Sequence, residues 1–231
     1  MRVLLKISGE ALAWKQSGWL DYVMLDEVCE KITNLVKKWI EVGLVVWAGN
    51  FIRGSEIEKI NIDRCNGDNM GMLAININAI ALSDVLNRKW IHTKILNSFW
   101  IDGIADRFNK HKAIKDLQSW KVIIFAGWTW NPYFTTDTAG VLRGLEIEAD
   151  MMIKATKVNG VYDKDPMKFD DAVFIPQASY DEVITKNLRV MDQTAIALAK
   201  ENSMKLKVVS LYDEDAILHS ILWKNVGTLI S

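Results

Sequence analysis

The sequence predicts an α/β protein, a three-layer αβα sandwich with a largely parallel central sheet. Short apolar runs typical of buried strands alternate with longer segments of helical periodicity. Glycine-bearing turns follow the first two strands. Half of the 231 residues are hydrophobic, and no linker, repeat or low-complexity tract divides the chain. We therefore expect a single domain over residues 1–231, with two lobes of one sheet at roughly 1–150 and 151–231.

The predicted elements alternate along the whole chain. The first half contains, in order, a strand at Arg2–Ile7, a helix at Tyr22–Ile40, a strand at Leu44–Val46 and a helix at Asp68–Leu86. The second half contains strands at Thr93–Leu96, Lys121–Phe125, Met151–Lys154 and Lys205–Ser210, and helices at Thr136–Glu148 and Leu188–Glu201. In such folds, ligands bind beyond the carboxyl ends of the strands, so the loops are the places to search for a site.

Charge and cysteine content argue against several classes of protein. The formal net charge is −1, so no overall positive field draws the protein to nucleic acid or to a membrane. Cys29 and Cys65 follow no metal-ligand spacing and suit a reducing compartment as inert thiols. No signal region and no apolar stretch of about 18 residues is expected. These observations predict a cytosolic protein.

Two early segments have the composition of phosphate-binding turns. Lys6-Ile7-Ser8-Gly9 places an ammonium and free backbone N–H groups together at the end of the first strand. After the second strand, Ala48-Gly49-Asn50-Phe51-Ile52-Arg53-Gly54 combines small residues with an arginine whose planar fork suits phosphate oxygens. Each segment alone is equally consistent with an ordinary turn beside a solvated cation.

Three later segments add groups that suit a nucleotide. Asn66–Leu73 contains Asp68, which can cap a helix or accept hydrogen bonds from a ribose. Thr129–Asp137 is dense in hydroxyl and amide groups just before a helix. Lys154–Pro166 offers an aromatic surface and polar groups after an apolar strand. A helix cap and a charged loop are the simpler explanations when each segment is taken alone.

Together and in this order, the five segments resemble the uridylate kinases of the amino-acid kinase family, and the resemblance extends to Gly227–Ile230. It implies an amino-acid kinase-like fold that transfers the γ-phosphoryl group of ATP to UMP in pyrimidine nucleotide biosynthesis, with UMP in the first lobe and ATP in the second. It places ATP at Lys6, Ile7, Ser8, Gly9, Gly49, Arg53, Thr156, Asn159, Tyr162 and Asp165. It places UMP at Ala48, Asp68, Thr129, Trp130, Asn131, Pro132, Tyr133, Phe134, Thr135 and Thr136.

The resemblance also implies a mechanism based on positioning and charge neutralisation. Lys6 and Arg53 would stabilise charge on the transferred group, Asp137 would orient these cations, and Mg²⁺ would bridge ATP oxygens. We assign no metal-ligating residue. No general base is expected, because the phosphate of UMP is largely ionised near neutral pH.

Family members are hexamers that GTP activates and UTP inhibits, and the resemblance implies the same for this chain. Ser17–Asp21 lies where a GTP-responsive loop is expected. Two alternatives stay open. One is a relative that phosphorylates a carboxylate or carbamate, against which the Asp68 segment and Thr129–Asp137 argue. The other is a nucleotide-binding regulator without catalysis.

The ten tryptophans depart from the family pattern. Trp47, Trp128 and Trp130 occur in or beside the phosphate-facing turns, where the resemblance predicts glycine and an indole should block the ligand. The others also fall at turns or helix ends, which commonly carry glycine: Trp14, Trp19, Trp39, Trp90, Trp100, Trp120 and Trp223. We hypothesise that the gene encodes glycine there by UGA, a codon that other genetic codes translate as tryptophan. The alternative is a genuinely tryptophan-rich, degenerate homologue.

A second departure concerns length. The stretch from Gly43 to Gly49 is shorter than in the family, and Ala48 stands where glycine is usual.

Overall fold

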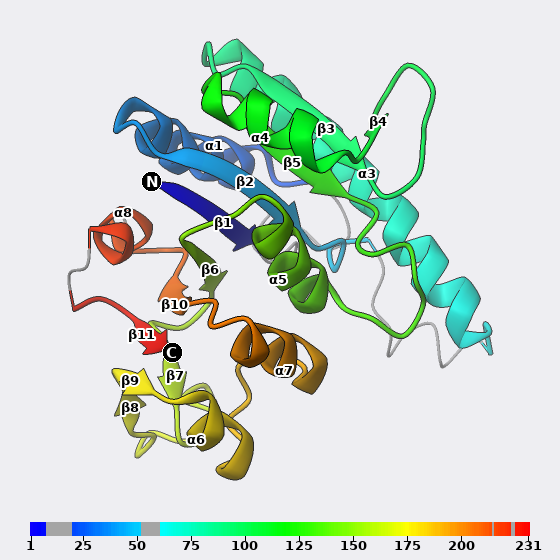
Figure 1. Cartoon of the computed structure of the whole chain (residues 1–231). Helices are drawn as coiled ribbons and strands as arrows, with labels where there is room; N and C mark the ends of the chain where they lie inside the picture. The colour runs from blue at the N-terminus through cyan, green and yellow to red at the C-terminus, as the bar shows by residue number, and fades with distance from the viewer. Residues whose placement is uncertain (8–19, 52–60, 214, 223–224) are drawn as a thin grey trace.

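Nine strands of the described residues form one central sheet, in the order β4-β3-β5-β2-β1-β6-β10-β11-β9 (Figure 1). The computed structural model describes residues 1–7, 20–51, 61–213, 215–222 and 225–231. Neighbouring strands in the sheet are parallel, except that β10 and β11 are antiparallel. The strands are β1 (Arg2–Ile7), β2 (Glu41–Val46), β3 (Thr93–Asn97), β4 (Asp106–Arg107), β5 (Val122–Ala126), β6 (Met151–Thr156), β9 (Gln177–Ala178), β10 (Leu206–Ser210) and β11 (Thr228–Ile230).

Helices cover both faces of this sheet. One core joins the sheet to α1 (Tyr22–Lys37), α3 (Arg64–Arg88) and α8 (Ala216–Ile221). The core on the opposite face joins it to α4 (Lys110–Gln118), α5 (Thr136–Glu146), α6 (Tyr180–Thr185) and α7 (Gln193–Glu201). A small antiparallel ribbon of β7 (Val161–Tyr162) and β8 (Phe174–Ile175) lies outside the main sheet. The predicted three-layer αβα architecture with a largely parallel sheet is confirmed.

Strand alternation determines which face each lysine of the inner strands occupies. In β1, Leu5 belongs to the core beneath α1 and α3, whereas Leu4 belongs to the core beneath α5. Because successive side chains of a strand point to opposite faces, Lys6 lies on the same face as Leu4. In β6 the same rule places Lys154 on the face of Met152, which belongs to the α5 core. Both lysines therefore lie on the face that α5 covers.

The start of α3 differs from the prediction. The helix begins at Arg64 instead of Asp68, so the whole segment predicted as its opening, Asn66–Leu73, lies inside it. The physical reason is the cap: the Asp63 carboxylate accepts hydrogen bonds from the N–H groups of Cys65 and Asn66, at 3.0 and 3.2 Å. Asp68 is thereby freed for another role.

Other helix boundaries differ from the prediction by a few residues, and several short elements were not predicted. The helix predicted at Leu188–Glu201 begins at Gln193, and the one predicted to reach Ile40 ends at Lys37. Helix ends depend on capping contacts that apolar periodicity does not report. The elements without a sequence prediction are α4, α6, α8, β4, β7, β8, β9 and β11.

By length and composition alone, α3 could cross a membrane, so the expectation that no segment was long and apolar enough is wrong. Yet 56% of its most apolar stretch is buried inside the protein. The helix packs against α1, β2, β3 and β5, and is the long cyan helix of Figure 1. Such burial is typical of a core helix.

Candidate active site

Two lysines on neighbouring strands share one carboxylate. Lys6 of β1 and Lys154 of β6 are register partners in the parallel ladder. Asp137, in the first turn of α5, lies between them, with Oδ1 3.1 Å from Lys6 Nζ and Oδ2 2.6 Å from Lys154 Nζ. Lys154 Nζ also donates to the carbonyl oxygen of Val190 at 2.5 Å. The three charged side chains are only 7%, 15% and 13% exposed for Lys6, Lys154 and Asp137, so water screens them little.

The electrostatics of this trio favour an incoming anion. Burial by itself would raise the pKa of Asp137, but the positive charges of Lys6 and Lys154 outweigh it and lower that pKa below its ordinary value. For Lys154, burial is the largest influence and lowers its pKa, although the charge of Asp137 opposes the shift. With both lysines protonated, the trio carries one excess positive charge in a desolvated position. Phosphate is the kind of group that such a charge attracts.

Hydrogen bonds at two helix N-termini hold Asp137 in place. Thr135 Oγ1 accepts from the N–H groups of Asp137 and Thr138, at 3.0 and 3.3 Å, and so caps α5. Asp192 accepts from the hydroxyls of Thr135 and Thr138, at 2.5 and 2.9 Å, and from the N–H of Ala195 at 2.9 Å, which caps α7. One carboxylate thus ties the N-terminus of α5 to that of α7.

A cavity of about 470 Å³ opens in front of the trio, at the carboxyl ends of β1 and β6. Its volume falls in the range of small-ligand sites. Apolar surface comes from Trp47, Trp128 and Phe134. The charged side chains described along its wall are Lys6, Arg64, Lys154, Lys157, Asp68, Asp137 and Asp192.

Asp68 joins α3 to the segment that precedes α5. Its Oδ2 accepts from the backbone N–H of Tyr133 at 2.8 Å and pairs with Arg64 Nε at 2.9 Å. Because Asp63 caps the helix, Asp68 is not the cap that the sequence made its simplest role. The carboxylate instead lies on the cavity wall, where it is available to a polar ligand.

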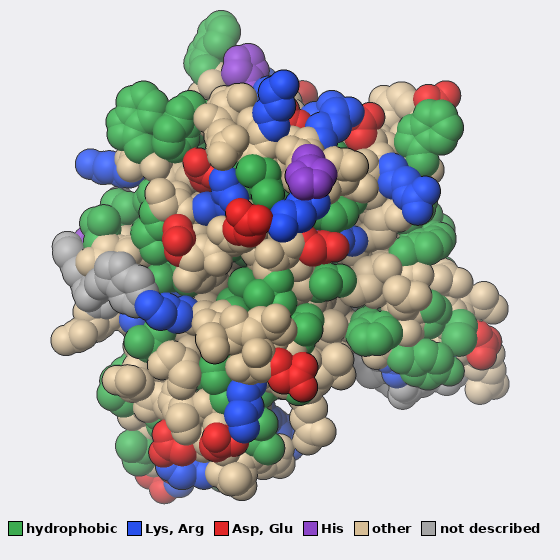
Figure 2. All heavy atoms as spheres, viewed as in Figure 1, with side chains coloured by type: hydrophobic (Ala, Val, Ile, Leu, Met, Phe, Trp, Pro, Cys, Tyr) green, Lys and Arg blue, Asp and Glu red, His purple; other side chains and the backbone are tan. Residues whose placement is uncertain are grey.

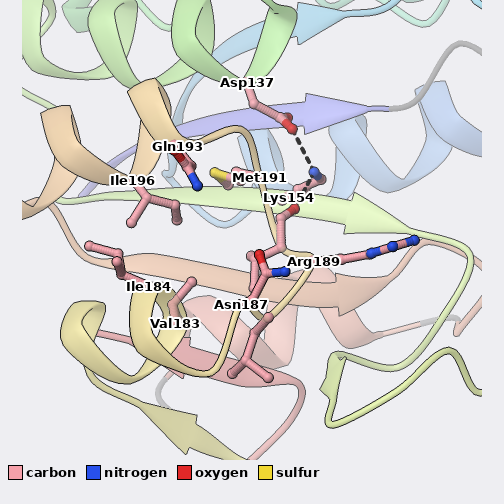
Figure 3. A pocket seen from close by; sticks show the side chains of 11 residues that line it. Asp137, Lys154, Val183, Ile184, Asn187, Arg189, Met191, Gln193 and Ile196 are labelled. Atoms are coloured by element: carbon pink, nitrogen blue, oxygen red, sulfur yellow. Dashed lines mark hydrogen bonds and ion pairs between the residues drawn. The ribbon is translucent and has the colours of Figure 1, made fainter.

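A second cavity, of about 330 Å³, meets the same ion pair from the side of α6 and α7 (Figure 3). Figure 3 shows the Asp137–Lys154 contact at its edge, with apolar side chains such as Val183 and Ile196 along its wall. Polar groups come from Asn187, Arg189 and Gln193. The Asp137–Lys154 pair therefore lies between two hollows.

The predicted site residues fall into three groups. Those that line the first cavity are Lys6, Asp68, Phe134, Thr135, Thr136, Asp137 and Thr156. Those that lie elsewhere in the described part of the chain are Ile7, Ala48, Gly49, Thr129, Trp130, Asn131, Pro132, Tyr133, Asn159, Tyr162 and Asp165. Ser8, Gly9 and Arg53 lie outside the described residues. The binding role of each residue stays a prediction.

The late predicted segment follows β6 into the β7–β8 ribbon. Thr156, the last residue of β6, donates from Oγ1 to the carbonyl of Val158 at 2.8 Å. Tyr162 packs edge-on against Phe174, with ring centroids 5.5 Å apart. Asp165 accepts from the N–H of Met167 at 3.0 Å. The segment adjoins the cavity through its first residues, up to Lys157, and then continues into the ribbon beyond the sheet.

Sequence reasoning assigned no role to Lys154 or Asp192, although both lie at the centre of the site. A signal for Lys154 was present: Lys6 and Lys154 each interrupt an apolar strand close to its end. Two such lysines on strands that pair in register must lie side by side. Asp192 directly precedes a helix, and its second function as the partner of two threonines requires the tertiary structure.

Metal-ligand residue types and cysteines also occur among the described residues. Within them, no group of three or more His, Cys, Asp or Glu side chains could hold a metal ion. Cys29 and Cys65 are free, and burial raises the pKa of Cys29 to about 12.

Comparisons with known proteins agree on one family. Residues 1–210 match the model of the amino acid kinase family. The protein named uridylate kinase from Campylobacter jejuni subsp. doylei is 46% identical over 221 residues, covering 95% of this chain and 92% of the relative. The uridylate kinase of Haemophilus ducreyi is 44% identical over 230 residues, covering 100% of this chain and 97% of the relative.

Solved structures give the same result. The crystal structure of UMP kinase from Bacillus anthracis superposes with a TM-score of 0.96 at 31% identity, covering 100% of this chain and 95% of that one. The UMP kinase of Ureaplasma parvum superposes with a TM-score of 0.94 at 33% identity, covering 100% and 98%. The similarity thus includes every residue that lines the two cavities.

Proposed function

This chain belongs to the amino acid kinase family, and we propose that it is a uridylate kinase, which transfers the γ-phosphoryl group of ATP to UMP and yields UDP and ADP. The family match over residues 1–210 and the two curated relatives, which align with 95% or more of the chain, support this assignment. The protein is accordingly an ATP-dependent nucleoside monophosphate kinase.

The observation that carries the mechanism is the buried Lys6–Asp137–Lys154 trio. Phosphoryl transfer needs positioned cations more than covalent chemistry. Lys6 and Lys154 place two ammonium groups side by side at the cavity, and Asp137 fixes both. As charge shifts toward the leaving oxygen of ADP, the nearby ammonium groups stabilise it without having to reorganise. The attacking oxygen belongs to the UMP phosphate and needs no base.

We infer that ATP enters with Mg²⁺ on its phosphate oxygens. Mg²⁺ keeps several waters and is commonly held through one or two carboxylates and the substrate phosphates. The lack of a three-ligand cluster among the described residues suits a metal that the nucleotide carries. Asp137 and Asp192 are carboxylates at this cavity, and both already have protein partners. When bound, the ion would neutralise charge on the phosphates.

We expect UMP to bind between α3 and the N-terminus of α5. Asp68 offers a carboxylate that suits ribose hydroxyls, and Phe134 offers an apolar ring at the same cavity. Thr135 and Thr136 lie at the start of α5, where the helix dipole favours a phosphate. ATP is then expected beside Thr156 and the β7–β8 ribbon, with the predicted contributions of Ser8, Gly9 and Arg53 outside the described residues.

Two alternatives are less well supported. A kinase for a carboxylate or carbamate would not need Asp68 beside the segment that ends at Thr136. A non-catalytic regulator would have no use for two buried ammonium groups held on one carboxylate. Nucleotide binding without turnover would favour the regulator.

An exposed apolar stripe on α3 supports assembly of several copies. Met70, Leu73, Ile77 and Ile80 follow one another at helical spacing and are 39–50% exposed. Such a stripe is typical of a surface that another chain covers. We therefore retain the proposed homohexamer, with α3 at a contact between copies. Regulation by GTP and UTP stays a proposal, and Ser17–Trp19 of the expected GTP loop lie outside the described residues.

A cytosolic location without nucleic-acid or membrane partners also stays a proposal. The near-neutral net charge supports it. Figure 2 shows Lys and Arg side chains interspersed with Asp and Glu over the visible face. A surface of this kind gives no broad positive patch for a polyanion.

The test is a coupled assay with Mg-ATP and a panel of acceptors. Two recombinant versions are compared: the protein with its ten tryptophans, and a variant in which all ten are replaced by glycine. UMP should be phosphorylated much faster than CMP, AMP, carbamate or acetate. If neither version phosphorylates UMP, the assignment is wrong.

A further inference from the structure

The backbone of most described tryptophans has a conformation that suits glycine. Of the seven tryptophans in the described residues, five have positive φ: Trp39 (61°), Trp90 (65°), Trp120 (61°), Trp128 (47°) and Trp130 (59°). Only a few per cent of non-glycine residues adopt such angles, and bulky ones do so least. Chance alone would therefore rarely place five of seven there.

Three of these residues occupy the position after a helix C-cap. Trp39, Trp90 and Trp120 follow the caps of α1, α3 and α4. In each case the tryptophan N–H bonds to the carbonyl three residues back, at 2.9, 3.0 and 2.8 Å. The next N–H bonds to the carbonyl five residues back, at 3.2, 3.0 and 3.1 Å. This pair of bonds defines the Schellman motif, whose left-handed position is usually glycine.

Packing does not explain the indoles at these helix ends. Trp90 is 89% exposed, and Trp39 is exposed as well. A large apolar side chain gains nothing from exposure to water, and its Cβ strains the left-handed backbone. The ring contact between Trp39 and Trp120 joins two exposed side chains. The residues after the C-caps of α5, α6 and α7 have the same conformation and are Glu148, Asn187 and Ser203. Polar residues therefore tolerate it, but they bring no exposed indole.

The turn after β5 repeats the pattern beside the candidate active site. Gly127, Trp128 and Trp130 all have positive φ within four residues. The indole Nε1 of Trp128 is buried without a hydrogen-bond partner in the described part of the chain, which is unfavourable for a buried tryptophan. Trp130 does contact Phe99, with ring centroids 3.9 Å apart, but it remains exposed.

We propose that glycine occupies all ten tryptophan positions in the natural protein, because its gene encodes them by UGA and its source organism translates UGA as glycine. Replacement at random would not concentrate on left-handed backbone and on turns. One reassigned codon would change every position at once, so Trp47 and Trp100, whose φ is not positive, follow the same rule. Trp14, Trp19 and Trp223 follow it too, although they lie outside the described residues.

The proposal changes the shape of the active site. The Trp47 ring lies 2.7 Å from where a Cβ on Gly49 would be, and the Trp128 ring lies 3.2 Å from the same point on Gly71. Both rings line the cavity in front of Lys6. Glycine at positions 47 and 128 would enlarge this cavity and expose backbone N–H groups to a phosphate. This consequence rests on the proposed kinase function, whereas the identity of the ten residues does not.

The decisive experiment is to sequence the gene and to analyse the natural protein by mass spectrometry. We expect UGA at all ten codons, and tandem mass spectrometry of the protein from its source organism should give glycine at each position covered. The intact protein should also lack the tryptophan contribution to near-ultraviolet absorbance and fluorescence. A UGG codon at any position, or a peptide that contains tryptophan, would overturn the proposal. No readout here depends on activity, so this proposal and the kinase assignment fail separately.

Matched variants test the backbone argument on which the proposal rests. In a chain with glycine at the other nine positions, Trp90→Gly is compared with Trp90→Ala, which removes the indole but keeps a Cβ. The glycine variant should have the higher Tm, because only glycine relieves the left-handed backbone. The control pair, Trp100→Gly and Trp100→Ala, concerns an exposed tryptophan whose φ is not positive, and there glycine should give no gain. Equal Tm values for the two Trp90 variants would contradict the argument.

Discussion

Lys6 and Lys154 lie side by side in the register of β1 and β6, and a single carboxylate, that of Asp137, contacts both ammonium groups. Two like charges in a desolvated position repel each other, so the pair needs an anion between them. The phosphate groups of a nucleotide are a second source of such anions. The free protein and the substrate complex would thus use the same two cations.

Replacement of Asp137 should abolish most activity. In Asp137→Asn the amide no longer neutralises or orients Lys6 and Lys154, so the cations lose their fixed positions. We expect kcat for UMP phosphorylation to fall by about 10²- to 10³-fold, the range for loss of one preorganised electrostatic group. The measurement is the coupled assay at saturating ATP and UMP.

A surface ion pair supplies the control. Asp171 pairs with Lys164 but is mostly exposed, so Asp171→Asn should leave kcat unchanged. Equal activity of Asp137→Asn and the original protein would show that the Lys6–Asp137–Lys154 trio is not needed for phosphoryl transfer.

The same carboxylate should make stability depend on acid. The folded-state pKa of Asp137 lies below its ordinary value of 3.8, so the unfolded chain binds the proton more tightly. Its contribution to the free energy of unfolding is fully present above that value and disappears as pH falls through the folded pKa. In urea unfolding at a series of pH values, the stability difference between the original protein and Asp137→Asn should be constant near neutrality and shrink below pH 3.8. A stability difference that grows on acidification would contradict a lowered pKa of Asp137 in the folded protein.

Apolar periodicity was sufficient to predict the architecture of the sheet but not its short elements. Strands such as β1 are buried on both faces and form continuous apolar runs, which is why Arg2–Ile7 was predicted with its observed bounds. The helix α4 carries six charged or polar residues in nine and buries only Ala113 and Leu117, so its apolar pattern is weak. Strands of two residues, such as β4, are too short to show a sequence pattern and are defined by pairing with a neighbouring strand.

The predicted site residues are those that the family resemblance marks, whereas a residue whose role depends on a tertiary contact was missed. Lys6 and Asp137 came from the family resemblance, and the structure brings them together across 131 positions. Asp192 could not be found in that way, because its threonine partners belong to a different helix. Asp68 was placed at a helix start, and the cap at Asp63 shows why its carboxylate instead contacts Tyr133 and Arg64 at the cavity.

Loss of Asp192 should affect both stability and catalysis. Asp192→Ala removes the cap of α7 and the partner of Thr135 and Thr138, so α5 loses its anchor. We expect the free energy of unfolding to fall by about 1–3 kcal/mol and kcat to fall at least tenfold. The matched control is Asn109→Ala, which removes the cap of α4, a helix that contributes no residue to either cavity, and should lower stability alone. If both variants lower kcat equally, the effect is one of general stability.

Asp68 should act on UMP and not on ATP. In Asp68→Asn the carboxylate is lost, and with it the charge-assisted bonds proposed for the ribose. We expect the KM for UMP to rise by about tenfold, a loss near 1.4 kcal/mol, while the KM for ATP stays unchanged. Asp84→Asn on the exposed face of the same helix should change neither constant. A selective rise in the KM for ATP would contradict this prediction and indicate that Asp68 contacts ATP.

The apolar stripe of α3 makes the proposed assembly testable without any ligand. Leu73 and Ile77 are exposed in one chain and would be buried between two copies. In the double variant Leu73→Lys and Ile77→Lys, two charges would enter that contact, and buried unpaired charges are strongly unfavourable. Light scattering after size-exclusion chromatography should therefore show smaller particles than the original protein. Ile104→Lys, an exposed position in the loop between β3 and β4, should keep the original size. A double variant that keeps its full size would mean that copies of the chain meet through another surface.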